Sequence, residues 1–409
     1  MKSILVLRGI PGSGKMTWIK ENRLEQFMIS KDLIRQLIGT VNFMDRDLSL
    51  KLDFTRSREE NVDSMFFRCI EEKMSRGNFI IIDNCNINPK SINKIYKYSK
   101  IFGYKVFIKS FDIPHDVFNR LKGRNTLFNK IPEDTIRGMI KSYLSFNYSQ
   151  LSNPNDVIVI KELSEISEYW RSKYKEYVIS GSMNNHIIGD IHSENSKLSN
   201  IVPLMDQDTY IFLGDYCDRG SDPVGTLKSL MSTSKLENSK NIIFLEGNHE
   251  VHLRRWANDL PPVSNSFKET TMNKLDSSDI QKSQLREFLN NLKPFIILNV
   301  DGSRFICSHA GLPNPKIIDL DYLYMGVGTF ISGYRDIDEQ DNKFSSISKI
   351  MKTGANKLYS IHGHISYEDK LELKYSNVVN LNSNPYEDGE GIKVAKIDTF
   401  GGILLNELK

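Results

Sequence analysis

Histidine, aspartate and asparagine recur in the second half of the chain at the ends of short apolar runs. Imidazole, carboxylate and amide oxygen suit divalent cations such as Mn²⁺, Fe or Zn²⁺. Two such cations about 3.5–4 Å apart can clamp a phosphate and generate hydroxide between them. The pattern therefore predicts a metal-binding site. The groups are, in chain order, GDIH (189–192), GDYCDRG (214–220), GNHE (247–250), SHAGLP (308–313) and HGH (362–364).

The apolar runs around these groups predict strands. They are TYIFLGD, NIIFLEGN, PFIILNV, SRFICSHAG and KLYSIHGH, and all but PFIILNV lead into a residue able to bind metal. Ligands that follow strands collect at one edge of a sheet, where loops begin. The motif-free segment 259–291 is expected either to cover this edge or to serve packing.

A glycine-rich loop near the start of the chain predicts a second phosphate site. Residues 9–15 match the loop G-x-x-x-x-G-K, in which backbone amides surround an anion and Lys15 reaches the outer phosphates. The motif continues with a hydroxyl residue, but this chain has Met16. A thioether does not ligate Mg²⁺, so we expect an active nucleotide site with weakened metal or ATP use. An inactive nucleotide-binding module is the alternative.

Strand and helix patterns alternate around this loop and predict a parallel sheet covered on both faces by helices. Strands are expected at 4–7, 27–30, 78–83 and 104–111. Helices are expected from residue 15 and over 48–74, 89–103, 114–122 and 132–146.

Composition and charge limit the remaining possibilities. The chain has 409 residues and a net charge of only +3, so a strongly basic coat for nucleic acid is absent. No apolar run reaches membrane-spanning length, so no membrane partner and a cytoplasmic location are expected. Four dispersed cysteines (Cys69, Cys85, Cys217 and Cys307) indicate buried thiols in a reducing compartment. We expect domains at 1–178 and 186–409, joined by a small, polar linker at 179–185.

The first half resembles the 5′-OH polynucleotide kinases in the segments GIPGSGKMTW, SKDLIR, IIIDNCNINP and NRLKGRN. The resemblance implies that Asp32 is the general base and that Arg35 binds the phosphate of the acceptor. It also implies that Arg120 and Arg124 belong to a lid that covers the triphosphate. It also implies an ATP–Mg²⁺ site made of Gly12, Ser13, Gly14, Lys15, Thr17 and Asp83. On the residues alone, Asp32 could instead cap a helix. The basic residues near 120 could be a solvated face.

The second half resembles the binuclear metallophosphoesterases of the phosphoprotein-phosphatase-like branch. The resemblance implies that Asp190 and His192 bind one metal, with His364 as a further candidate, and that Asn248, His309 and His362 bind the other. It implies that Asp215 bridges both metals and that His249, oriented by Asp218, protonates the leaving oxygen. Arg219 and Arg254 would hold the phosphate. Ser193 stands where glycine is usual, and Asn382 stands where related bacterial repair phosphatases carry an aspartate.

The order of the two halves resembles the first two modules of bacterial polynucleotide kinase-phosphatases, and a ligase module, the third in that family, is not expected in this chain. The resemblance implies phosphorylation of 5′-OH ends with ATP and Mg²⁺. It also implies removal of 3′-phosphate or 2′,3′-cyclic phosphate ends with two divalent metals, Mn²⁺ being the first expectation. RNA or DNA ends are the expected substrates, and a separate RNA ligase is the expected partner. A homo-oligomer is a further possibility that the sequence leaves open. A protein Ser/Thr phosphatase or dinucleoside-polyphosphate hydrolase, fused to a small-molecule kinase or an inactive ATP-binding module, is the alternative.

Overall fold

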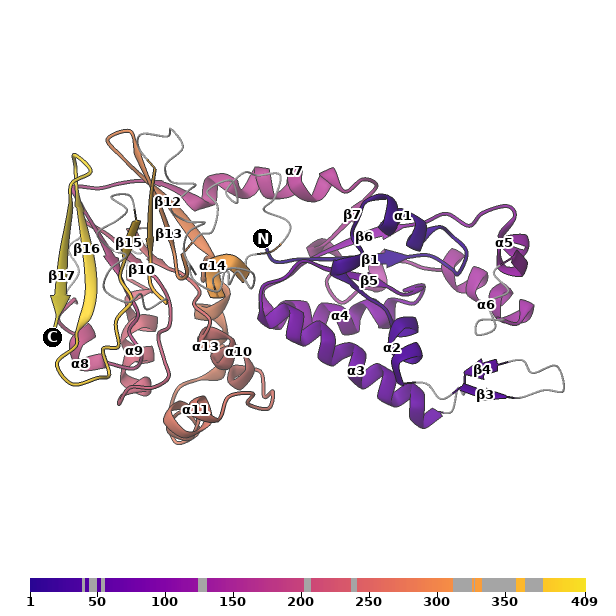
Figure 1. Cartoon of the computed structure of the whole chain (residues 1–409), viewed down its shortest axis with the longest axis horizontal. Coiled ribbons are helices and arrows are strands. Elements are labelled where there is room, and N and C mark those ends of the chain that lie inside the picture. Colours follow the sequence, from indigo (N-terminus) through magenta and orange to yellow (C-terminus); the bar gives the residue numbers. More distant parts are fainter. Residues whose placement is uncertain are drawn as a thin grey trace, which may run out of the picture. The chain divides into compact units, whose positions relative to one another are not determined.

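The computed structural model describes residues 1–38, 41–43, 50–52, 56–123, 131–201, 207–236, 241–311, 326, 328–332, 358–364 and 378–409 (Figure 1). Its contacts divide the chain into two compact units. The first is Met1–Glu168 with Tyr324–Gly326, and the second is Tyr169–Leu323 with Val327–Lys409. The sequence predicted a linker at 179–185 between the two domains. Residues 179–185 include the end of one strand, β8 (Val178–Ser180), and the start of another, β9 (Asn184–Ile188).

The first unit is built on one five-stranded parallel sheet. Its order is β2-β5-β1-β6-β7, and every neighbouring pair is parallel. The strands are β1 (Ser3–Arg8), β2 (Met28–Ile29), β5 (Ile80–Asp83), β6 (Lys105–Ser110) and β7 (Val157–Ile160). Every residue of β1 is buried, so both faces of the sheet are covered there, and the predicted doubly covered parallel sheet is confirmed.

The helices of this unit include the five that were predicted and two that were not, at 31–38 and 164–173. They are α1 (Lys15–Glu21), α2 (Lys31–Ile38), α3 (Arg56–Ser75), α4 (Pro89–Phe102), α5 (Val117–Gly123), α6 (Glu133–Leu144) and the first half of α7 (Ser164–Lys173), whose second half belongs to the second unit. The expected helix from residue 48 is wrong at its start, because β4 (Leu50–Leu52) pairs with β3 (Val41–Phe43). Leucines alternate with other residues at 48, 50 and 52, which is the period of a strand rather than of a helix.

The second unit contains two five-stranded sheets, β11-β10-β9-β16-β17 and β15-β14-β13-β12-β8. The further strands are β10 (Thr209–Phe212), β11 (Ile242–Phe244), β12 (Phe295–Val300), β13 (Ser303–Ser308), β14 (Leu358–His362), β15 (Val378–Asn380), β16 (Ile392–Asp398) and β17 (Ile403–Leu408). One apolar core joins Ile211 and Leu213 of the first sheet to Leu298 and Phe305 of the second. The predicted sandwich is therefore confirmed.

Helices cover the other face of the first sheet (Figure 1). Tyr210 and Phe212 alternate with Ile211 along the chain and pack into this second core, as the two-residue period of a strand requires. The helical elements are α8 (Asn195–Leu198), α9 (Pro223–Thr233), α10 (Glu250–Ala257), α11 (Asn265–Phe267), the π-helix η6 (Lys268–Met272), α12 (Asn273–Asp276), α13 (Lys282–Asn290) and α14 (Gly328–Ser332). None of the described helices of either unit combines the length and apolar character needed to cross a bilayer.

Strand direction explains which apolar runs carry candidate ligands. β9, β10 and β11 are mutually parallel, and β13 is parallel to β14, so their carboxyl ends can gather ligands. β12 runs antiparallel to β13, so its carboxyl end lies at the opposite edge. For this reason PFIILNV, which forms β12, is the run that leads into no candidate ligand.

The cysteine prediction holds only in part. All four thiols are free, and Cys217 and Cys307 are buried, but Cys69 is exposed and Cys85 is half-buried. Cys69 lies on α3, a long helix with many polar residues, where its side chain need not face the core.

Candidate functional site

The carboxylate of Asp215 is the centre of the candidate metal site. It lies just past β10 and is buried. Its Oδ2 atom is 3.3 Å from Nε2 of His309, 3.7 Å from Nε2 of His192 and 3.9 Å from Nε2 of His249. Three imidazoles from three separate loops therefore converge on one carboxylate.

These side chains form two groups that share Asp215. One group is His192, Asp215 and His249, and the other is Asp215, His309 and His364, each with ligand atoms within 4.8 Å of one another. His249 is the predicted proton donor, so its place in the first group marks its position beside the site and not a metal ligand. Asn248 adds an oxygen 3.1 Å from Nε2 of His309. An arrangement in which one carboxylate belongs to both groups suits two neighbouring cations with a bridging ligand.

Asp190 lies beside the second group. Its Oδ1 atom is 3.8 Å from Nδ1 of His309, and its carboxylate accepts a hydrogen bond from the backbone N–H of His364. Gly363 allows this approach, because a Cβ atom there would lie 2.1 Å from Oδ1 of Asp190. The middle residue of HGH therefore has to be glycine.

The two histidines of HGH have different positions from those predicted. His362 joins neither group, because it is the last residue of β14 and its ring lies against Gly311, with Nδ1 2.9 Å from the carbonyl oxygen of Gly363. His364 instead groups with His309 and Asp215, since its left-handed backbone (φ 62°) turns its ring toward them. The structure therefore brings His364, and not His362, together with His309 and Asp215. The ligand role of His362 stays a prediction.

The chemistry of these donors fits divalent metal ions. Nδ1 of His309 is buried and has no hydrogen-bond partner, and the carboxylates of Asp190 and Asp215 are buried close to it. Burial and the charge of Asp215 raise the pKa of Asp190 to about 7. Burial alone would lower the pKa of His309, but the acidic groups around it raise that pKa to about 9. Divalent cations would take the place of such protons, because ligation requires neutral imidazole and ionised carboxylate.

His249 and Asp218 form a hydrogen-bonded pair beside this centre. Nδ1 of His249 lies 2.9 Å from Oδ2 of Asp218, which leaves Nε2 facing the metal groups. Burial lowers the pKa of His249, but the charges of Asp215 and Asp218 outweigh it and raise the pKa above its ordinary value. Burial likewise opposes ionisation of Asp218, yet hydrogen bonds from His249 and Thr270 hold the pKa of Asp218 below its usual range. The pair has the geometry of a proton donor held by a carboxylate.

The two predicted phosphate-binding arginines differ in their surroundings. Arg219 is exposed next to Asp218, and its guanidinium donates to the hydroxyl of Tyr386 over 3.3 Å. Arg254 is only 3% exposed, and it donates to Glu246, to Asn290 and to the carbonyl of Leu289. The guanidinium of Arg254 is thus engaged inside the protein, so Arg219 is the better placed of the two for the predicted phosphate role.

Glu250 is a structural residue that the sequence interpretation left without a role. Its carboxylate accepts hydrogen bonds from the backbone N–H groups of Asp215, Tyr216 and Gly247, over 2.7–2.9 Å. It therefore ties the loop that carries Asp215 to the loop that carries Asn248 and His249. The signal was present, since Glu250 is the last letter of GNHE.

Most non-glycine residues with positive φ in the described part of the chain lie in the metal-site loops. This backbone region is unfavourable for residues with a Cβ atom and is enriched at functional sites. Ser193 is one of them (φ 63°), which explains why glycine suits its position. The six are His192, Ser193, Asp215, Asp218, Arg219 and His364.

The glycine-rich loop of the first unit has the shape of a phosphate cradle. Gly12 and Gly14 have φ of 84° and 95°, and α1 begins directly after Gly14. Nζ of Lys15 donates to the carbonyls of Gly9 and Ile10 across the loop. The hydroxyl oxygen of Ser13 is buried without a hydrogen-bond partner. Asp83 ends β5 beside the end of β1, at the edge from which the loop starts.

The remaining kinase candidates lie on the same unit. Arg35 donates to both carboxylate oxygens of Glu59 and to Oδ1 of Asp32, whose side chain is 73% exposed. The hydroxyl of Ser30, not Asp32, accepts from the first turn of α2, so Asp32 is not the helix cap.

The predicted lid and helix residues are more exposed. Arg120 pairs with Asp116 on the surface, and Thr17 is exposed on α1 beside the half-buried Met16. Arg124 lies outside the described residues.

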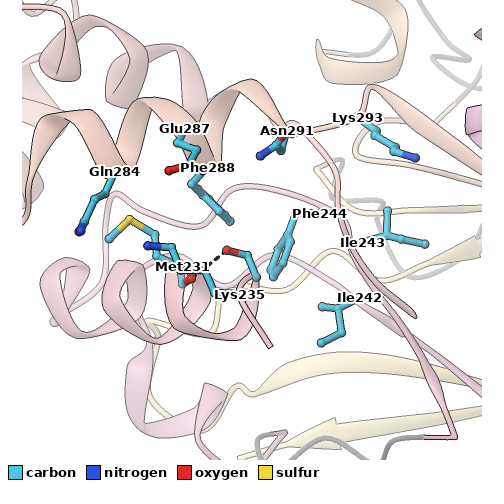
Figure 2. A pocket seen from close by; sticks show the side chains of 11 residues that line it. Met231, Lys235, Ile242, Ile243, Phe244, Gln284, Glu287, Phe288, Asn291 and Lys293 are labelled. Carbon is cyan, nitrogen blue, oxygen red and sulfur yellow. Dashed lines mark hydrogen bonds between the residues drawn. The ribbon is translucent and has the colours of Figure 1, made fainter. Parts of the chain in front are cut away.

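A cavity of about 370 Å³ opens elsewhere on the second unit, between α9, β11 and α13 (Figure 2). Phe244 and Phe288 line it, and both rings contact Tyr216, the neighbour of Asp215 in the chain. None of the metal-site residues lines this cavity, so it is separate from the candidate active site.

The fold and these donors define a metal-dependent phosphoesterase. Residues 183–394 match the family of calcineurin-like phosphoesterases, and the chain belongs to that family. Residues 4–144 match the AAA domain. The chain thus joins an AAA-type, P-loop-like domain to a calcineurin-like phosphoesterase domain.

Several known proteins resemble the phosphoesterase part. The serine/threonine-protein phosphatase PP2A-like PPG1 of Candida albicans is 30% identical over 34% of this chain and 31% of its own length. The serine/threonine-protein phosphatase PP1-1 of Saccharomyces cerevisiae is 32% identical over 34% of this chain and 41% of its own length. The chain spans only about a third to a half of the first such relatives.

Two phosphatases are among the solved structures that have a low overall similarity to the chain. A putative diadenosine tetraphosphatase is 18% identical, with a TM-score of 0.38, over 56% of this chain and 97% of its own. A protein serine/threonine phosphatase from Saccharomyces cerevisiae with similarity to human PP5 is 14% identical, with a TM-score of 0.39, over 68% and 96%.

The contrast between the two arginines can be tested directly. Arg254→Met should lower the free energy of unfolding of the second unit by about 3–5 kcal/mol, because it removes the guanidinium that donates to the buried carboxylate of Glu246. Arg219→Met should leave stability unchanged but weaken inhibition of p-nitrophenyl phosphate hydrolysis by inorganic phosphate. Thermal unfolding and inhibition constants measure the two effects. Equal stability loss in both variants, or weaker phosphate inhibition in Arg254→Met alone, would contradict these positions.

Proposed function

We propose that the chain is a bifunctional enzyme that heals nucleic-acid ends. The first unit transfers the γ-phosphate of ATP to a 5′-hydroxyl, and the second removes a 3′-phosphate or a 2′,3′-cyclic phosphate. The observation that carries the phosphoesterase half is that Asp215 lies between His192 on one side and His309 with His364 on the other, with the His249–Asp218 pair next to it. The sequence resemblance to kinase-phosphatases supports the choice of substrate.

In the phosphoesterase step, water adds to phosphorus and the bond to the leaving oxygen breaks. When bound, two divalent cations supply charge for the phosphate and lower the pKa of water. His249, held by Asp218, gives the Nε2 proton to the leaving oxygen, and the proton released by water restores the balance. Arg219, exposed beside this pair, binds the phosphate oxygens.

In the kinase step, Asp32 takes the proton of the attacking hydroxyl. The carboxylate of Asp32 is exposed and paired with Arg35, which Glu59 holds in place, so base and phosphate-binding cation already stand together. Lys15 lies across the glycine-rich loop, where it would reach the outer phosphates of ATP. Ser13 could donate its unpartnered hydroxyl to a bound phosphate.

The relatives favour a second candidate for the phosphoesterase half. Phosphatases named for serine and threonine substrates align with this chain, and a putative diadenosine tetraphosphatase is among the related folds. A phosphopeptide or dinucleoside-polyphosphate hydrolase would use the same metal ligands. The choice of substrate therefore has to be measured.

One RNA with a 5′-OH and a 2′,3′-cyclic phosphate tests the proposal. With ATP, Mg²⁺ and Mn²⁺, the wild-type chain should add a 5′-phosphate and clear the other end. Lys15→Ala should lose only the first reaction, and Asp215→Ala only the second, because each residue belongs to a different unit. Both ends can be followed by mass spectrometry of the RNA.

The same assay includes the competing substrates as controls. A phosphoserine peptide and diadenosine tetraphosphate are supplied at equal concentration. Faster hydrolysis of either, with both RNA ends unchanged, would replace the end-healing proposal by the second candidate. Hydrolysis of the RNA end without 5′ phosphorylation would leave the first unit as an ATP-binding module.

Met16 provides a separate test of the kinase half. We expect Met16→Ser to raise kinase turnover several-fold at low Mg²⁺, since serine supplies the oxygen ligand that a thioether cannot. Turnover against Mg²⁺ concentration measures the effect, and Thr17→Ala serves as the neighbouring control. A rise of about twofold or less would mean that the methionine does not limit catalysis.

A further inference from the structure

The motif-free segment between GNHE and β12 reaches the general-acid pair. Two of its hydroxyls donate to Oδ1 of Asp218, that of Thr270 over 2.6 Å and that of Ser266 over 3.0 Å. These residues stand four apart along α11 and the π-helix η6, so both face the same side. The segment thus contacts a residue that the proposed reaction uses.

The two oxygens of Asp218 have separate tasks. Oδ1 accepts from Thr270, from Ser266 and from the backbone N–H of Arg219, which is 2.9 Å away. Oδ2 lies 2.9 Å from Nδ1 of His249. Three donors on one oxygen fix the plane of the carboxylate and leave the other oxygen for the imidazole. These hydrogen bonds hold the orientation of the carboxylate, although the backbone of Asp218 is in a strained conformation (φ 79°).

Thr270 is the stronger of the two side-chain donors. Its hydroxyl has a single proton and also lies 3.0 Å from the carbonyl of Ser266. A hydrogen bond to an ionised carboxylate is shorter and roughly twice as strong as one to a neutral group, so the proton goes to Asp218. Thr270 is half-buried, whereas Ser266 is exposed to competing water.

The segment itself is firmly attached to the unit. Phe267 is buried in the helical core, and Oδ1 of Asp276 accepts from Nε1 of Trp256 over 2.7 Å. Nζ of Lys274 donates to the carbonyl of Ser221, in the loop that follows Arg219. Thr270 therefore lies between two parts of the segment that are both attached to the rest of the unit.

We propose that Thr270, assisted by Ser266, is a positioning residue for proton donation by His249. It holds Asp218 so that Nε2 of His249 faces the leaving oxygen when the phosphorus–oxygen bond breaks. This inference rests on the proposed phosphoesterase function. It adds that the reaction depends on the segment over 264–276 most strongly for esters whose leaving group needs a proton.

Esters with different leaving groups test this without assuming an RNA substrate. p-Nitrophenyl phosphate releases a stable anion and needs little protonation, whereas phenyl phosphate releases a basic oxygen. Thr270→Val should lower kcat on phenyl phosphate at least about tenfold, a part of the 10²–10⁴-fold that general acids contribute. It should lower kcat on p-nitrophenyl phosphate less than about twofold and leave KM unchanged for both.

Two further variants separate positioning from folding. Thr270→Ser keeps the hydroxyl and should restore phenyl phosphate turnover to within about twofold of wild type. In a His249→Asn background, Thr270→Val should have no further effect, because the residue it positions is absent. An equal loss on both esters, a loss that serine does not restore, or an additive loss in the double variant would overturn the inference. If wild type hydrolyses neither ester, the proposed phosphoesterase function fails instead.

Discussion

The convergence of three imidazoles on the buried carboxylate of Asp215 is the constraint on which the second unit depends. Such a group is costly in a protein interior unless cations compensate it. The fold brings the ligands together by running β9, β10 and β11 in one direction and by pairing β13 with β14 in parallel. Glu250 then joins two of the loops through their backbone N–H groups.

The strained backbone of these loops also follows from the need to bring the ligands together around Asp215. A loop that turns back at once from a strand end places its side chain toward the neighbouring loop, and this often needs positive φ. Positive φ occurs here at His192, Asp215, Asp218 and His364. Gly363 lacks the Cβ atom that would collide with Asp190. The glycine-rich loop of the first unit also needs positive φ, at Gly12 and Gly14, so that its backbone can curve around an anion.

The sequence predicted what depends on local pattern. The parallel sheet, the sandwich and the order of the metal motifs follow from strand periods and from ligand residues at strand ends. It could not supply what depends on neighbours in three dimensions. His362 and His364 are two residues apart, and only the turn at Gly363 determines which ring faces Asp215. Arg254 pairs with Glu246 inside the core, which no spacing reveals. Thr270 belongs to no motif, so its contact with Asp218 could be found only in the structure.

Metal content tests the central arrangement most directly. After loading with Mn²⁺ and removal of free ion, elemental analysis of the wild-type chain should find about two ions per molecule. His364→Ala should retain about one, whereas Asp215→Ala should lose both, since its carboxylate belongs to both groups. His186→Asn, which alters a pair with Asp208 outside the site, should retain two. Two ions in Asp215→Ala, or a single ion in the wild type, would contradict the shared carboxylate.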